Sequence, residues 1–94
     1  MIKHIVMWKL IDPADAPRFK QLLDTCKGLV PGMREFEVSL RDAALEASHD
    51  VMLYSVFDDE AALQSYVVHP VHKDVAATLG TLRESRAVFD FRAG

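Results

Sequence analysis

Four strand-like stretches, separated by helical and turn-forming segments, are the feature of this sequence that most limits its fold. The strand-like stretches are rich in β-branched and aromatic residues and cover residues 2–11, 33–40, 51–57 and 85–91. With right-handed crossovers, the order strand, helix, strand, strand, helix, strand gives the split βαβ arrangement. The sequence therefore predicts one α+β, ferredoxin-like domain over residues 1–94, with a four-stranded antiparallel sheet and its helices on one face.

The two helical stretches have recognisable ends. Apolar residues recur at spacings of three and four over residues 14–27, and Gly28 follows as a C-cap. The second stretch is broken at His69, because a residue that precedes proline avoids the helical conformation. Pro70 is suited to the first position of a new helix, which we expect to end before Gly80.

Both faces of the predicted sheet are apolar. In the first strand, Val6 and Trp8 point to one side while Ile5 and Met7 point to the other. Helices on a single face would leave the second set in water, and an apolar patch of roughly several hundred Å² usually marks an interface. We therefore expect a homodimer in which two sheets pack face to face as an α+β barrel.

Charge and hydropathy limit the classes of partner. Fourteen acidic and eleven basic residues give a formal charge of −3, and the basic residues form no stripe, so nucleic acid is not an expected partner. The apolar run at the N-terminus is too short to span a membrane, which predicts a cytoplasmic protein. The single cysteine, Cys26, excludes an internal disulfide, and we expect it to be buried.

A tyrosine and two histidines lie three residues apart at the predicted helix break, as Tyr66, His69 and His72. His72 falls in the first turn of a helix, where the helix dipole disfavours a charged imidazole, so the ring can accept a proton. Tyr66 ends the preceding helix and could donate a hydrogen bond to an oxygen that becomes negative. The pattern is typical of a proton-abstraction site.

Two other interpretations of this motif stand beside the catalytic one. A tyrosine and a histidine at a helix break can simply satisfy buried backbone groups. His69 and His72 also have a spacing seen in metal pairs, but Pro70 interrupts the helix that would align them and no third ligand is near in sequence. We therefore expect no metal and no cofactor.

His4 and Asp90 form a second candidate group. His4 is expected on the same side of the first strand as Val6 and Trp8, where a histidine is usually hydrogen-bonded within the core. Asp90 is flanked by two phenylalanines in the last strand, and a carboxylate there needs a partner. His4 on a neighbouring strand is a suitable one.

Several segments of the chain resemble the stress-responsive A/B barrel family of dimeric α+β barrels. They are IKHIVMWKL, the Pro31-Gly32 turn, the block from Tyr54 to Asp58, LQSYVVHPVHKDV and AVFDF. One plant member of that family closes a linear polyketide by intramolecular aldol condensation, using a tyrosine and a histidine of this motif. The resemblance implies that Tyr66 and His72 are catalytic, and that His4, His69 and Asp90 are polar residues around the pocket.

The resemblance also implies which residues contact a substrate. Pocket-lining positions are expected at Val6, Trp8, Phe19, Leu23 and Val88. Arg83 and Arg86 stand where the cyclase is apolar, which favours a smaller or anionic ligand over a long-tailed polyketide.

Three functions are compatible with these residues. The first is a cofactor-independent enzyme in which His72 removes a proton next to a carbonyl and Tyr66 holds the resulting oxyanion. The second is a non-catalytic, stress-related dimer that binds a small molecule, with structural histidines. The third is a cofactor-free monooxygenase that oxidises a phenolic substrate.

Overall fold

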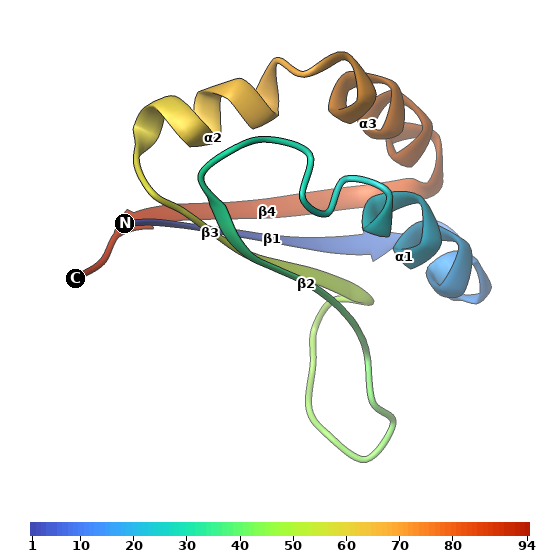
Figure 1. Cartoon of the computed structure of the whole chain (residues 1–94). Helices are drawn as coiled ribbons and strands as arrows, with labels where there is room; N and C mark the ends of the chain where they lie inside the picture. The colour runs from blue at the N-terminus through green and yellow to red at the C-terminus, as the bar shows by residue number, and fades with distance from the viewer.

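The computed structural model describes residues 1–94 and has the predicted order of elements (Figure 1). Its strands are β1 (Ile2–Leu10), β2 (Met33–Leu40), β3 (Val51–Phe57) and β4 (Arg83–Arg92). Its helices are the 3-10 helix η1 (Pro13–Asp15), α1 (Ala16–Asp24), α2 (Glu60–Val67) and α3 (Pro70–Leu82). The strands form one antiparallel sheet in the order β2-β3-β1-β4, which confirms the α+β, ferredoxin-like fold.

Two helix ends differ from the predicted positions. Helix α1 ends at Asp24, because the next N–H groups bond to carbonyls only three residues back, as from Cys26 to Leu23 at 2.9 Å. Gly28 then adopts a positive φ of 71°, which glycine tolerates without strain. Helix α3 continues through Gly80 to Leu82, so the prediction that it would end before Gly80 was wrong. The Arg83 N–H still bonds to the Leu79 carbonyl, which keeps this last turn closed.

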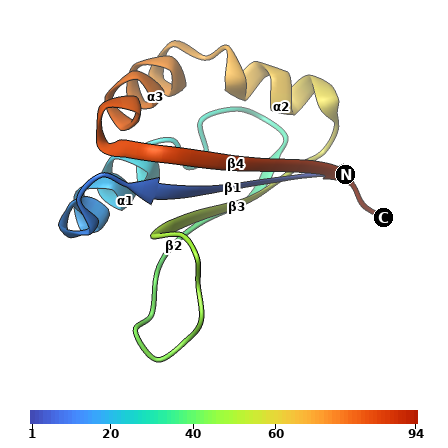
Figure 2. The same ribbon diagram turned by 180° about the vertical axis from the view of Figure 1, so that it is seen from behind.

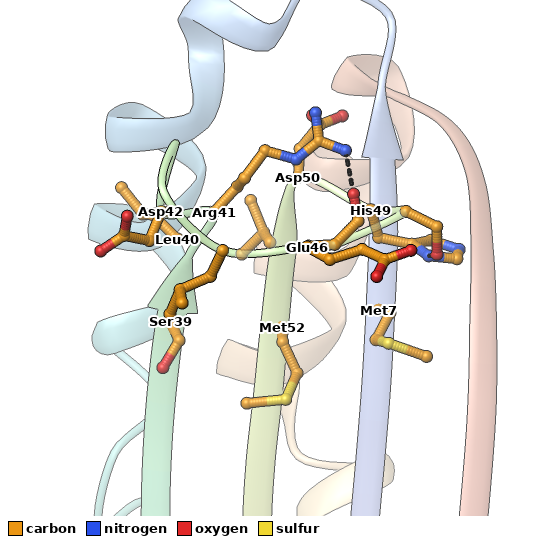
Figure 3. Close-up of a pocket in the computed structure, with 13 residues that line it drawn as sticks. Met7, Ser39, Leu40, Arg41, Asp42, Glu46, His49, Asp50 and Met52 are labelled. Carbon is orange, nitrogen blue, oxygen red and sulfur yellow. Dashed lines mark hydrogen bonds between the residues drawn. The ribbon is translucent and has the colours of Figure 1, made fainter.

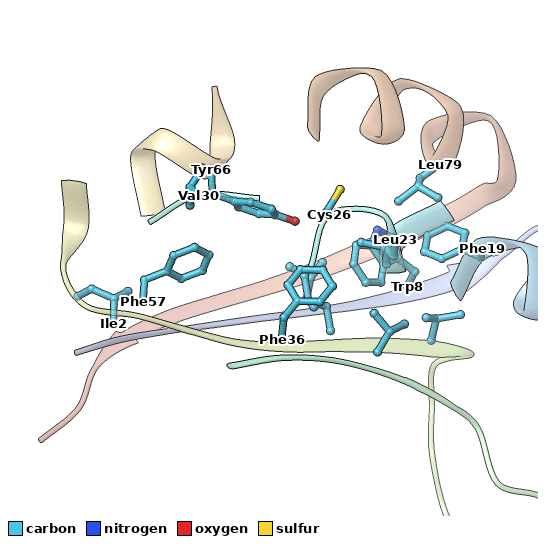
Figure 4. Packing of buried hydrophobic residues seen from close by; sticks show 14 of the residues in the cluster. Ile2, Trp8, Phe19, Leu23, Cys26, Val30, Phe36, Phe57, Tyr66 and Leu79 are labelled. Carbon is cyan, nitrogen blue, oxygen red and sulfur yellow. The ribbon is translucent and has the colours of Figure 1, made fainter. Parts of the chain in front are cut away.

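The three α-helices lie on one face of the sheet, as both ribbon views show (Figures 1 and 2). The core lies between the two layers and includes Trp8 of β1, Phe19 of α1 and Leu53 of β3 (Figure 4). Trp8 and Phe19 meet edge to face, with 5.1 Å between ring centroids. Cys26 is buried in the same core, as predicted. None of the helices is long and apolar enough to cross a membrane.

The opposite face of the sheet has no helix on it, and we call it the uncovered sheet face. Phe89 pairs with Ile5 across β4 and β1, and Phe91 pairs with Lys3, so both phenylalanines belong to this face. Phe89 is 69% exposed and Met7 is 36% exposed. The apolar second face expected from the strand pattern is therefore present.

A loop over residues 41–50 extends beyond the uncovered sheet face (Figures 1 and 2). Asp50 fastens its end to β1, because the Asp50 N–H donates to the Trp8 carbonyl and the Asp50 carboxylate accepts from the Leu10 N–H, both at 2.8 Å. The loop leaves a hollow of about 690 Å³ against Met7 and Met52 (Figure 3). This hollow lies on the face away from the Tyr66 and His72 side chains.

Candidate active site between the sheet and helix α3

The break between α2 and α3 sets the direction of His72. His69 is extended, with φ −62° and ψ 134°, and its ring Nδ1 accepts a hydrogen bond from the Val71 N–H at 3.1 Å. His69 is therefore the N-cap residue of α3, and Pro70 takes the first helical position, as predicted. After this turn of the chain, the His72 ring lies against Tyr66, with 4.4 Å between ring centroids.

His72 is held as a neutral ring with one nitrogen available. Its Nδ1 lies 3.0 Å from the Val67 carbonyl oxygen, which can only accept, so Nδ1 donates. In the neutral ring Nε2 then carries the free lone pair. Burial lowers the pKa of His72; the Val67 bond opposes this, while the Arg86 guanidinium and the His4 and His69 rings nearby lower the pKa further. The ring is thus suited to accept a proton at neutral pH.

Tyr66 provides a buried donor without a partner. Its side chain is 1% exposed, and its hydroxyl makes no hydrogen bond within the chain. The hydroxyl points toward the Cys26 sulfur (Figure 4). Burial raises the pKa of the phenol well above its usual value, and the adjacent Cys26 adds to the rise, so the group stays protonated. A buried hydroxyl of this kind can donate to a ligand oxygen.

His4 and Asp90 meet as the sequence predicted. They are directly opposite each other in the β1–β4 pairing, and the Nδ1 of His4 donates to the Asp90 carboxylate. The His4 ring lies edge-on to Tyr66, with 6.3 Å between centroids. Asp90 therefore fixes the orientation of a second imidazole beside the Tyr66 ring.

A cavity of about 40 Å³ joins these groups between the sheet and α3. Six of the expected site residues line it, namely His4, Val6, Trp8, Leu23, Tyr66 and His72. Four others are placed elsewhere. Phe19 is fully buried behind Trp8, His69 caps α3, Asp90 contacts His4, and Val88 is 44% exposed on β4 opposite Val6.

The rest of the lining includes residues not singled out from the sequence. Val75, Ala76 and Leu79 follow His72 on α3 at spacings of three or four, so they share its face of the helix. This spacing is the sequence feature from which these three lining residues could have been predicted. Arg86 also lines the cavity, whereas Arg83 begins β4 and does not.

Comparisons with known proteins agree with the fold described above. A dimeric ferredoxin-like protein of unknown function from Bacteroides fragilis is 29% identical, with 98% of this chain and 95% of that one covered and a TM-score of 0.81. A Dabb family protein from Mesorhizobium loti is 23% identical, with coverage of 99% and 96% and a TM-score of 0.80. SnoaB, a cofactor-independent oxygenase from Streptomyces nogalater, is 16% identical, with coverage of 99% and 92% and a TM-score of 0.78.

No protein of curated function matches the sequence. The model of the stress responsive A/B barrel domain, however, matches residues 2–93, nearly the whole chain. This match agrees with the segments that first indicated the resemblance, from the opening strand to the last one. The chain therefore belongs to the stress-responsive A/B barrel (Dabb) family.

Proposed function

We propose that the protein is a cofactor-independent enzyme that removes a proton next to the carbonyl group of a small molecule. The observation that carries the proposal is the Tyr66 hydroxyl, which is buried without a partner beside the neutral ring of His72. An unsatisfied buried donor costs about 1–3 kcal/mol, and a ligand oxygen would remove that cost. A developing oxyanion would gain most from this donor.

In the proposed step, Nε2 of His72 takes a proton from the carbon next to the carbonyl. The electron pair of that C–H bond forms the carbon–carbon double bond of an enolate, and the carbonyl π pair moves to the oxygen. Tyr66 donates its hydrogen bond to that oxygen. His4, oriented by Asp90, lies beside the Tyr66 ring and also lines the cavity, where it would contact the ligand.

We also propose that the working form is a homodimer that closes the uncovered sheet face. The similar protein from Bacteroides fragilis is described as dimeric and ferredoxin-like. The residues of the catalytic group lie on the helix side of the sheet, away from the uncovered sheet face. Dimerisation would therefore complete the fold without covering the site.

The second candidate function is a non-catalytic dimer that binds a small molecule. The small cavity and the central place of Tyr66 in the core favour it, because both suit a packing role. Cofactor-free oxidation, the chemistry named for SnoaB, is a further possibility that the shared fold alone suggests. Deuterium uptake separates these functions, since only an enolising site exchanges the protons next to a carbonyl.

The direct test is proton NMR of small ketones and oxo acids in D₂O with and without the protein. Exchange that depends on the protein supports the proposed enzyme. Saturable binding without any exchange would favour the non-catalytic dimer instead.

The exchange rate should depend on pH through His72. Because burial lowers the pKa of His72, the rate should rise with pH to a plateau, with a midpoint below the usual value of about 6.5. As pH falls, His72 becomes protonated in the unfolded chain at a higher pH than in the folded chain. The contribution of His72 to the free energy of unfolding is therefore complete above about pH 6.5 and is lost as pH falls through its folded pKa. NMR titration of the ring gives the midpoint, and a value above that of free histidine would contradict the assignment.

Metal removal should change nothing. No group of three or more His, Cys, Asp or Glu side chains in the chain is arranged to hold a metal ion, and the His69 ring faces its own helix. We expect a chelator to leave the melting temperature and ligand binding unchanged. Loss of either on chelation, with recovery when one metal is restored, would contradict this expectation.

A further inference from the structure

The cavity carries a cation that no group of the chain neutralises. Arg86 lies on β4 directly opposite Trp8 of β1, so its side chain belongs to the helix side of the sheet. It lines the cavity together with His72, yet it is solvent-exposed and makes neither a hydrogen bond nor an ion pair with any residue. Its guanidinium is therefore free to bind a ligand at the mouth of the cavity.

The surrounding charges favour an anion. Arg86, His4 and His69 are the positively charged or chargeable groups that act on His72. The carboxylate of Asp90, on the same strand as Arg86, already accepts the hydrogen bond of His4. The chain as a whole carries a formal charge of −3, so this basic mouth contrasts with its average surface. Such a local field attracts anions and raises their concentration at the site.

The size of the cavity limits the ligand to a few atoms. Its volume is about 40 Å³, whereas one buried water needs roughly 10–15 Å³. Room for roughly three water-sized groups suits a short carbonyl compound whose charged end stays at the mouth. It does not suit a ligand of drug size, which needs about 300 Å³ or more.

We propose that Arg86 is a specificity-determining residue and that the ligand is a small oxo acid. Its carboxylate would bind the guanidinium of Arg86, a planar donor that matches carboxylates in a bidentate way. Its carbonyl oxygen would then reach the unpartnered Tyr66 hydroxyl, and the adjacent C–H group would face Nε2 of His72. The placement of the carbonyl group at Tyr66 and His72 rests on the proposed function. The placement of the carboxylate rests on Arg86 alone.

The test compares pyruvate with butanone, an uncharged ketone of similar size, in NMR titrations of the full chain. Arg86→Met removes the charge and keeps most of the side chain's volume. Arg18→Met is the matched control, because Arg18 is exposed on α1, forms no ion pair and does not line the cavity. We expect Arg86→Met to weaken pyruvate binding roughly 10- to 100-fold, as for loss of a charged hydrogen bond, and to leave butanone binding unchanged. Arg18→Met should affect neither ligand.

The outcomes separate this inference from the proposed function. Equal pyruvate affinity in Arg86→Met and wild type, or no saturable pyruvate binding to wild type, overturns the anion site. Deuterium uptake by butanone in the wild-type chain tests the catalytic pair without a carboxylate bound at Arg86. If pyruvate binds through Arg86 but neither compound exchanges protons, the anion site stands and the proposed reaction fails.

Discussion

Replacing His72 with alanine is expected to slow proton exchange on a carbonyl ligand by roughly two to four orders of magnitude. The reason is that Nε2 of this ring is the unprotonated nitrogen beside Tyr66, while Nδ1 is engaged by Val67. The companion change, Tyr66→Phe, should cost roughly two to three orders of magnitude, the usual loss for one oxyanion donor. Both effects are read as initial rates of deuterium uptake by NMR.

Stability measurements on the same variants separate catalysis from packing. Tyr66→Phe removes a buried hydroxyl that has no partner, so the melting temperature should stay the same or rise. His72→Ala removes the donor to the Val67 carbonyl, but Val67 is solvent-exposed and water can replace the ring. The melting temperature of this variant should therefore stay close to that of the wild type. His49→Ala is the matched control, since His49 lies in the loop on the other side of the sheet.

A different pattern is expected if the two side chains only support the fold. His72→Ala would then lower the melting temperature, because it removes a ring that packs against Tyr66, whereas Tyr66→Phe would still leave no buried group unpaired. Ligand affinity would fall with stability, and exchange per folded molecule would remain at the wild-type rate. That result would contradict the catalytic assignment.

The sequence predicted those features that depend on short-range pattern. Stretches rich in β-branched and aromatic residues placed all four strands, and Pro70 located the helix break at His69, because a residue before proline avoids the helical region. The pairing of His4 with Asp90 followed from the need of a strand carboxylate for a partner on the neighbouring strand. The end of α3 could not be predicted in this way, because nothing in the local pattern shows that a glycine will remain helical.

The lining of the cavity was harder to predict, because it depends on how six elements, β1, α1, β3, α2, α3 and β4, meet. Phe19 and Leu23 lie on the same face of α1, yet only Leu23 reaches the cavity, while Trp8 covers Phe19. His69 was expected near the substrate, but its ring turns back to cap α3. The capping role is a local hydrogen bond that competes with any role in the pocket, and the sequence motif cannot distinguish the two.

The largest structural effect is expected from Met7→Glu on the uncovered sheet face. Met7 lies at the centre of this face, on β1 between β3 and β4, and no helix covers it. In the proposed dimer the new carboxylate would be buried without a partner, which costs several kcal/mol. Sedimentation velocity should therefore show a dimer for the wild-type chain and a monomer or aggregate for the variant.

The matched control is Val71→Glu, at the first turn of α3 on the other side of the molecule. Val71 is 40% exposed, close to the 36% of Met7, and a carboxylate suits a helix N-terminus. Val71→Glu should remain a dimer. A difference in sedimentation between Met7→Glu and Val71→Glu would then be due to the position of the new charge and not to the loss of an apolar side chain. Because the cavity lies on the helix side of the sheet, away from Met7, a folded Met7→Glu monomer should still bind the ligand. A Met7→Glu chain that sediments as the wild-type dimer would place the interface on another surface.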